Sequence, residues 1–161
     1  MLTRDPPPGV VLIGHTEEDI PVLTVKLVGP NDTPYAGGNF LVEAKLGHRY
    51  PFEAPQVRFV TRVYHPNVDE AGRICLDSLK LPPAGSWRPS LNLAQVFSQL
   101  VILFAEPGLS DPLMKDIAEL YKSDREHFNK IAREWTAQYA QTDASSTKTK
   151  KQRLEEDGAL S

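Results

Sequence analysis

A cysteine and an asparagine eight residues apart are the first candidates for chemistry in this chain. Cys75 is the only cysteine, and Asn67 precedes it within the run from Tyr64 to Asp77. A thiol can carry an acyl group as a thioester, and a side-chain amide can donate hydrogen bonds to an oxyanion without acting as a base. Composition alone favours a small, buried and inert cysteine, since free cysteines are among the most buried residues. Acyl transfer and core packing therefore both remain open for Cys75.

The bulk composition limits what kind of protein this is. The 161 residues, 40% of them hydrophobic, suffice for one domain with an adequate core. No apolar run is long enough to cross a bilayer, and the N-terminus lacks the apolar stretch of a signal peptide. We therefore expect an intracellular protein, nuclear or cytoplasmic, that does not act at a membrane. The net charge of −3 argues against direct binding of nucleic acid.

Metal binding and disulfide bonding are also disfavoured by the sequence. A single cysteine cannot close an internal disulfide or supply a zinc site with several thiolates. The histidines show no metal-ligand spacing; they are His15, His48, His65 and His127. We expect no structural metal.

The last 18 residues differ in composition from the rest of the chain. Residues 144–161 contain four basic and three acidic side chains, which is 4 − 3 = +1, with few large apolar residues. Such a segment cannot bury enough surface to offset its ordering entropy, so we expect a disordered tail after a core domain of residues 1–143. A small basic patch for nuclear import or for a partner is the other interpretation.

The hydrophobic pattern predicts a run of strands followed by a run of helices. Four short segments rich in β-branched and aromatic residues have the pattern of strands: residues 10–13, 22–28, 40–46 and 57–60. From about Arg62 to Leu91 no regular pattern is visible. Helices are predicted from the N-cap Asn92 to Pro107, from the cap Asp111 to about Tyr121, and from a capping box at Ser123 onward. This order is typical of an α+β domain with helices packed on an antiparallel sheet.

Several motifs, in order along the chain, resemble those of the ubiquitin-conjugating enzymes. They are Gly29-Pro30 with Thr33-Pro34-Tyr35, Tyr50-Pro51-Phe52, His65-Pro66-Asn67, Ile74-Cys75-Leu76-Asp77, Trp87 with Pro89, and Asp111-Pro112-Leu113. The resemblance spans about residues 6–140. It implies a four-stranded antiparallel meander with helices packed on it. Residues 80–92 and 5–9 most resemble the T-type branch of the family, which attaches single ubiquitins to DNA-repair proteins.

The resemblance also implies a role for each motif residue. Cys75 would hold the ubiquitin C-terminus as a thioester, and Asn67 would hold the active-site loop in shape or donate its amide to the oxyanion. Asp77 and Asp111 would border the channel of the acceptor lysine. Supporting residues would be His65, Pro66 and Leu76, with His65 bracing the loop rather than forming a Cys-His pair. The ligase-binding residues would be Pro51, Phe52, Trp87, Pro89 and Ser90, with core packing as an equal alternative for Trp87.

The same resemblance implies partners and no bound cofactor. The partners are ubiquitin, its activating enzyme, a RING-type ligase and a substrate lysine, and ATP is used by the activating enzyme rather than by this chain. Family members normally begin with a basic amphipathic helix, whereas only four residues precede Asp5-Pro6-Pro7-Pro8 here. We therefore expect the fold without its first helix, in either a shortened form or a variant with impaired charging. A non-catalytic scaffold and transfer of another ubiquitin-like modifier remain alternatives.

Overall fold

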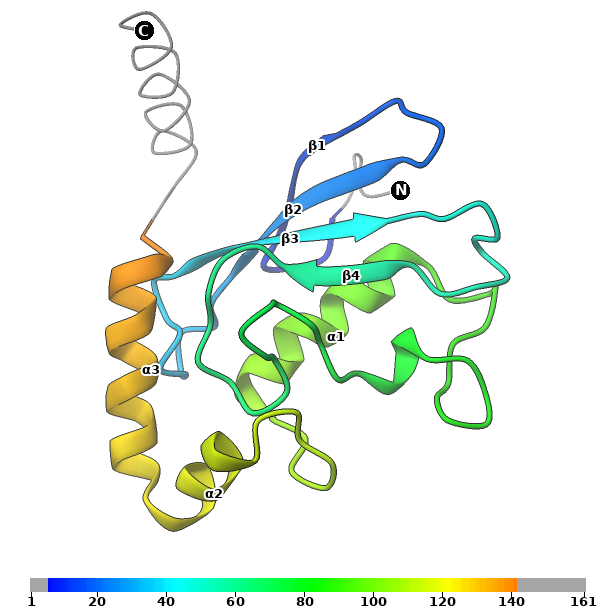
Figure 1. The fold of residues 1–161 in the computed structure, drawn as a ribbon. Helices are drawn as coiled ribbons and strands as arrows, with labels where there is room; N and C mark the ends of the chain where they lie inside the picture. The colour runs from blue at the N-terminus through cyan, green and yellow to red at the C-terminus, as the bar shows by residue number, and fades with distance from the viewer. Residues whose placement is uncertain (1–5, 142–161) are drawn as a thin grey trace, which may run out of the picture.

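The computed structural model describes residues 6–141, so the predicted disordered tail lies outside the described residues. Four strands precede three helices (Figure 1): β1 Val10–His15, β2 Val22–Val28, β3 Asn39–Lys45, β4 Gln56–Phe59, α1 Leu93–Ala105, α2 Lys115–Ser123 and α3 Arg125–Tyr139. A short 3-10 helix, Asp77–Leu79, interrupts the long segment between β4 and α1. The predicted α+β class and the four strands are confirmed, with strand ends shifted by one or two residues.

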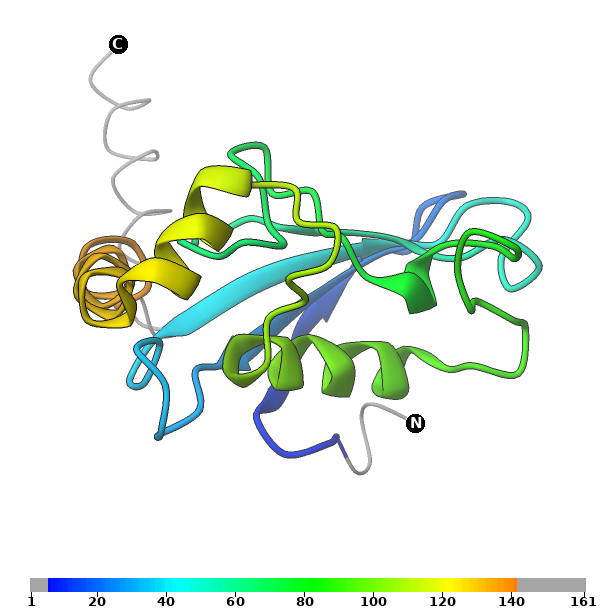
Figure 2. The same ribbon diagram turned by 90° about the horizontal axis from the view of Figure 1, so that it is seen from below.

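The sheet is an antiparallel meander in the order β1-β2-β3-β4, as predicted. Each strand pairs with its neighbour in the chain, as in the partners Val25 and Val42, and Val42 and Phe59. The connections are too short for crossovers, so neighbouring strands pair directly. Figure 2 shows α1 along one face of this sheet and α2 with α3 at one end.

Alternation along the strands decides which face carries α1. Phe40, Val42 and Ala44 of β3 point to the same side and are fully buried, because successive side chains of a strand alternate between faces. They pack in one cluster with Phe97 and Phe104 of α1. The opposite face of β1 carries two exposed apolar side chains, Val11 and Ile13. This core fixes the position of α1. The C-terminal end of α1 in turn fixes the start of the loop between α1 and α2.

The start of α1 agrees with the sequence. Asn92 accepts a hydrogen bond from the Gln95 backbone N–H at 2.9 Å, and the Gln95 side chain accepts from the Asn92 N–H at 3.0 Å. This reciprocal capping box satisfies two donors that the first helical turn leaves free. The helix ends at Ala105, two residues before Pro107.

The starts of the other two helices were predicted wrongly. Asp111 does not cap α2, which begins four residues later at Lys115, because the hydrogen bond from the Met114 N–H to the Pro66 carbonyl holds this segment against another loop. Ser123 does not open α3 either, since it closes α2 and its hydroxyl donates to the Glu119 carbonyl. The N-cap is Asp124, whose carboxylate accepts from the His127 N–H at 3.1 Å. None of the helices among residues 6–141 has the length and apolar character needed to cross a bilayer.

The cap assignment predicts different costs for two neighbouring substitutions. Asp124→Ala should lower the free energy of unfolding by about 1 kcal/mol, because it leaves a backbone N–H of α3 without its acceptor. Ser123→Ala should cost only a few tenths of that, roughly 0.3 kcal/mol, since an exposed side-chain hydrogen bond within a helix contributes little. Urea unfolding of both variants measures the difference. Equal losses would contradict Asp124 as the cap.

Candidate active site

His65 anchors the turn that carries Asn67 to the end of α1. Its Nε2 lies 2.8 Å from the Leu103 carbonyl oxygen, and its Nδ1 accepts the Asn67 backbone N–H at 3.0 Å. Both ring nitrogens are therefore occupied, and the ring is 2% exposed. Burial lowers the pKa of His65 to about 4, although the hydrogen bond to the Leu103 carbonyl opposes this shift. A neutral imidazole with both nitrogens engaged is not available as a base for Cys75.

Asn67 joins two loops that are distant in the sequence. Its Nδ2 donates to the Gly108 carbonyl at 2.8 Å, and its Oδ1 accepts the Gly108 N–H at 2.8 Å. Pro66 contributes a further contact, since its carbonyl accepts the Met114 N–H at 3.0 Å. These bonds hold residues 106–114 beside the His65-Pro66-Asn67 turn. In this geometry the Asn67 amide holds the loop in shape.

Cys75 lies where the two loops meet. Its backbone N–H donates to the Asn67 carbonyl at 2.8 Å, and its half-buried thiol lies 3.5 Å from the Asp111 carbonyl oxygen. The Lys80 Nζ lies 3.8 Å from the Cys75 sulfur. Sequence reasoning missed Lys80, although a lysine five residues after the cysteine in the same loop was a usable signal. A cation at this distance can neutralise a negative charge on the sulfur.

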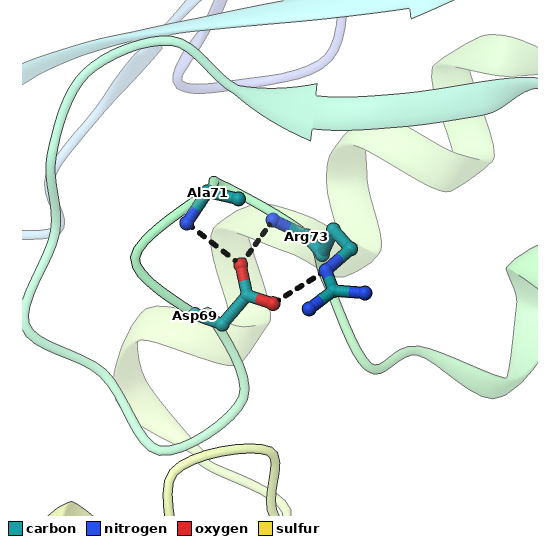
Figure 3. Close-up of polar contacts among 3 residues, drawn as sticks. All are labelled: Asp69, Ala71 and Arg73. Atoms are coloured by element: carbon teal, nitrogen blue, oxygen red, sulfur yellow. Dashed lines mark hydrogen bonds and ion pairs between the residues drawn. The ribbon is translucent and has the colours of Figure 1, made fainter.

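The turn before Cys75 is closed by one carboxylate (Figure 3). Asp69 Oδ1 accepts the backbone N–H groups of Ala71 and Arg73, and Oδ2 accepts from the Arg73 Nε at 2.6 Å. Burial would raise the pKa of the Asp69 carboxyl, but hydrogen bonds from Arg73 and Ala71 and the Arg73 charge outweigh it and lower the pKa. The turn, which ends at Arg73, is thus fixed directly before the Ile74-Cys75 pair, a role that sequence reasoning did not assign to Asp69.

Gly72 lets this turn pack against β4. Its φ is +86°, and a Cβ atom there would collide with the Phe59 carbonyl. The Phe59 N–H in turn donates to the Gly72 carbonyl at 2.9 Å. The active-site loop is therefore attached to the sheet on one side and to α1 on the other.

The remaining candidate acids and Leu76 border the cysteine. Asp77 and Asp111 are both exposed; Asp77 is two residues after Cys75 in the chain, and the Asp111 backbone carbonyl lies 3.5 Å from the thiol. The Asp77 backbone carbonyl accepts the N–H groups of Lys80 and Ser86, which shapes the following loop. Leu76 is half-buried and packs at the margin of the core.

Comparison with known proteins settles the family. Residues 1–136 match the ubiquitin-conjugating enzyme family. The chain belongs to this family. It is similar to the ubiquitin-conjugating enzyme E2 T of Danio rerio, with 49% identity over 87% of this chain and 72% of that protein. The Homo sapiens E2 T is 48% identical over 87% of this chain and 71% of that protein, and the Xenopus laevis E2 T is 46% identical over 87% and 72%.

Membership makes this chain a ubiquitin-conjugating transferase. Ubiquitin, an activating enzyme and a ligase are the partners that membership implies. The predicted resemblance to the T-type branch is confirmed by the E2 T relatives.

The predicted ligase-binding residues of this ubiquitin-conjugating enzyme divide into exposed and buried ones. Phe52 is 71% exposed, and Pro89 and Ser90 are also exposed, whereas Pro51 is half-buried. Trp87 is 1% exposed, so its assignment to the binding surface was wrong and core packing is correct. Its Nε1–H donates to the Pro51 carbonyl at 3.0 Å. Trp87 therefore holds the two exposed loops together without facing a partner.

The buried His65 predicts a dependence of stability on pH. The pKa of His65 is about 4 in the fold and about 6.5 in the unfolded chain, so between these values the unfolded state binds more protons. Stability from the neutral ring is fully present above pH 6.5 and is lost as pH falls toward 4. The loss over this window is roughly 3 kcal/mol.

Urea unfolding between pH 7 and pH 4 measures this loss. In His65→Gln the part of the slope between pH 6.5 and pH 4 should disappear, whatever the stability of the variant at pH 7. His48→Gln, which replaces an exposed histidine, is the matched control and should keep the slope. An unchanged slope in His65→Gln would show that another group titrates.

Proposed function

We propose that Cys75 carries ubiquitin as a thioester and passes it to a lysine of a protein substrate, assisted by a RING-type ligase. The observation that carries this proposal is the position of the Cys75 thiol, which is half-buried where the two joined loops meet. A buried thiol could not receive a protein, and an unsupported thiol could not orient the acyl group. The loops supply the support and leave one side open.

The reaction consists of two acyl transfers on the same sulfur. In the first, Cys75 attacks the thioester between the ubiquitin C-terminal glycine and a cysteine of the activating enzyme, which leaves as a thiolate. In the second, a neutral lysine amine attacks the Cys75 thioester, a C–N bond forms and the C–S bond breaks. The Lys80 ammonium is close enough to neutralise the departing sulfur. ATP is spent by the activating enzyme, so no cofactor is needed on this chain.

Asp111 and Asp77 are proposed to prepare the incoming lysine. Both side chains are exposed, Asp77 is two residues after Cys75 in the chain, and the Asp111 backbone carbonyl lies 3.5 Å from the thiol. A carboxylate can orient the lysine ammonium and accept its proton, which gives the neutral amine that attacks. The exposed Phe52 and Pro89 are proposed to meet the ligase, because exposed, rigid apolar groups bind at low entropy cost. Because the chain resembles the T-type branch, whose members attach single ubiquitins to DNA-repair proteins, such a protein in the nucleus is the substrate that we propose.

The thioester is tested by incubating the chain with activating enzyme, ATP and ubiquitin and running a non-reducing gel. A band should appear that is larger by one ubiquitin, disappears with thiol reductant, and is absent for Cys75→Ala. Alkylation by iodoacetamide checks independently that the thiol is accessible. A thiol that reacts with iodoacetamide but never takes up ubiquitin would favour the scaffold alternative instead.

The substitution Asp111→Asn should affect the two acyl transfers, loading and discharge, differently. Loading of Cys75 should be nearly unchanged, whereas discharge of the thioester to free lysine should slow by about ten- to hundred-fold, because only discharge needs the carboxylate. Rates are measured by single-turnover loading and by discharge after the activating enzyme is quenched. Glu119→Gln removes an exposed acid elsewhere and is the charge-matched control. Equal slowing of both steps would refute a role in the lysine channel.

A further inference from the structure

A cleft whose lining residues are distant in sequence from Cys75 lies between the loop after β2 and the face of α3. Its volume is about 610 Å³, and its walls include Pro30, Pro34 and Arg133. Figures 1 and 2 both show the loop that follows β2 running beside α3. Nothing in the proposed ubiquitin transfer uses this cleft.

Three side chains of α3 form a stripe of hydrogen-bond donors along the cleft. Arg125, Asn129 and Arg133 are spaced by four residues, so they lie on one face of the helix, and all three line the cleft. Within residues 6–141, neither arginine has a carboxylate at ion-pair distance. The acid among the cleft residues is Asp32 of the facing loop, so the lining has more positive than negative charge.

Arg125 is held in place although its position in the helix is unfavourable for a cation. It is the first residue of α3, where the helix dipole favours an acid. Its guanidinium lies 3.4 Å from the centre of the Tyr121 ring, and its Nε donates to the Tyr121 carbonyl at 3.0 Å. The Nη groups donate no hydrogen bond to any of the described residues. Arg125 is therefore a pre-positioned cation with free donors, as an anion-binding residue requires.

The distance between the two arginines determines how far apart the acidic groups of a ligand must lie. Eight helical residues separate Arg125 from Arg133, which is about 12 Å along the axis, too far for one phosphate or one carboxylate to bridge. Two acidic side chains four residues apart on an extended peptide are about 13 Å apart and point to the same side. Asn129, between the arginines, has an amide that can both donate to and accept from a peptide backbone.

We propose that this cleft binds an acidic, extended segment of the protein that carries the acceptor lysine, with Glu or Asp at positions i and i+4. The substrate is the partner because the cleft wall includes Ala105, and Asp111 beside the Cys75 thiol is only six residues further on. Six residues span at most about 20 Å, so a segment bound in the cleft can present a neighbouring lysine to the thioester. The assignment of the partner depends on the proposed ubiquitin transfer; the binding of the acidic segment does not.

Binding is tested with the full chain and fluorescein-labelled heptapeptides by fluorescence anisotropy at low ionic strength. The peptide Gly-Glu-Ala-Thr-Ala-Glu-Gly should bind about ten-fold more tightly than its Gln-for-Glu counterpart, as expected for two exposed charge pairs. A peptide with adjacent Glu residues controls for spacing and should lose most of this gain. Arg133→Glu should abolish the preference, and Arg88→Glu, which makes the same charge change outside the cleft, should keep it. Equal affinity for the Glu and Gln peptides would overturn the proposal.

The role of the cleft in transfer is tested with the same peptides extended by a lysine. Discharge of the Cys75 thioester should show a KM about ten-fold lower for the Glu peptide than for the Gln peptide, and Arg133→Glu should remove this difference. Discharge to free lysine should be the same in the wild type and in Arg133→Glu. No discharge to any acceptor would refute the transfer function itself, whereas discharge without a Glu preference would refute only the cleft.

An acidic run near the C-terminus of the chain itself, Glu155-Glu156-Asp157, is the competing occupant. Replacing these three residues by Gln, Gln and Asn should leave the affinity for the Glu peptide unchanged if the cleft serves the substrate. A several-fold gain in affinity would show that the chain's own acidic run occupies the cleft, and would overturn the assignment to the substrate.

Discussion

The two hydrogen bonds exchanged between Asn67 and Gly108 hold the active site together. They connect the turn before Cys75 to residues 106–114, two segments about 40 residues apart in the chain. Asn67 is 3% exposed, and a buried amide must satisfy both its donor and its acceptor to avoid a penalty of about 1–3 kcal/mol. The position of Asp111 beside the thiol follows from this pair.

The pair is itself positioned by the C-terminal end of α1. The last carbonyls of a helix have no partner within the helix, and His65 satisfies that of Leu103. Phe97 and Phe104 fix α1 against the sheet. The end of α1 therefore fixes the position of the His65 ring, and the ring in turn fixes the Asn67 backbone. A protonated ring could not accept the hydrogen bond from the Asn67 N–H. Burial lowers the pKa of His65, keeps the ring neutral and so preserves this hydrogen bond.

The sequence predicted correctly those features that depend on neighbouring residues. It failed for features that depend on contacts between residues far apart in the chain. The alternation of Phe40, Val42 and Ala44 and the cap at Asn92 are properties of neighbouring residues, so they were visible in the sequence. Asp111 has the sequence of a helix cap, but contacts with the Cys75 loop keep it out of a helix. Trp87 is buried by its contact with Pro51, 36 residues earlier, and no local pattern distinguishes a packed tryptophan from an exposed one. Gly108 was missed for the same reason, because its partner Asn67 lies 41 residues earlier in the chain.

The two roles considered for Asn67 compete for one amide. While Nδ2 donates to the Gly108 carbonyl, it has one remaining hydrogen to direct at an oxyanion, and the orientation of that hydrogen is fixed by the bond to Gly108. An amide held at both its oxygen and its nitrogen loses no further freedom when charge develops nearby, which is the condition under which a donor stabilises a transition state most. The loop-holding role is therefore a precondition of an oxyanion role rather than an alternative to it. Loss of the two hydrogen bonds to the Gly108 backbone would therefore impair both roles of Asn67. The turn would lose its attachment to residues 106–114, and the amide N–H would no longer be held in one orientation.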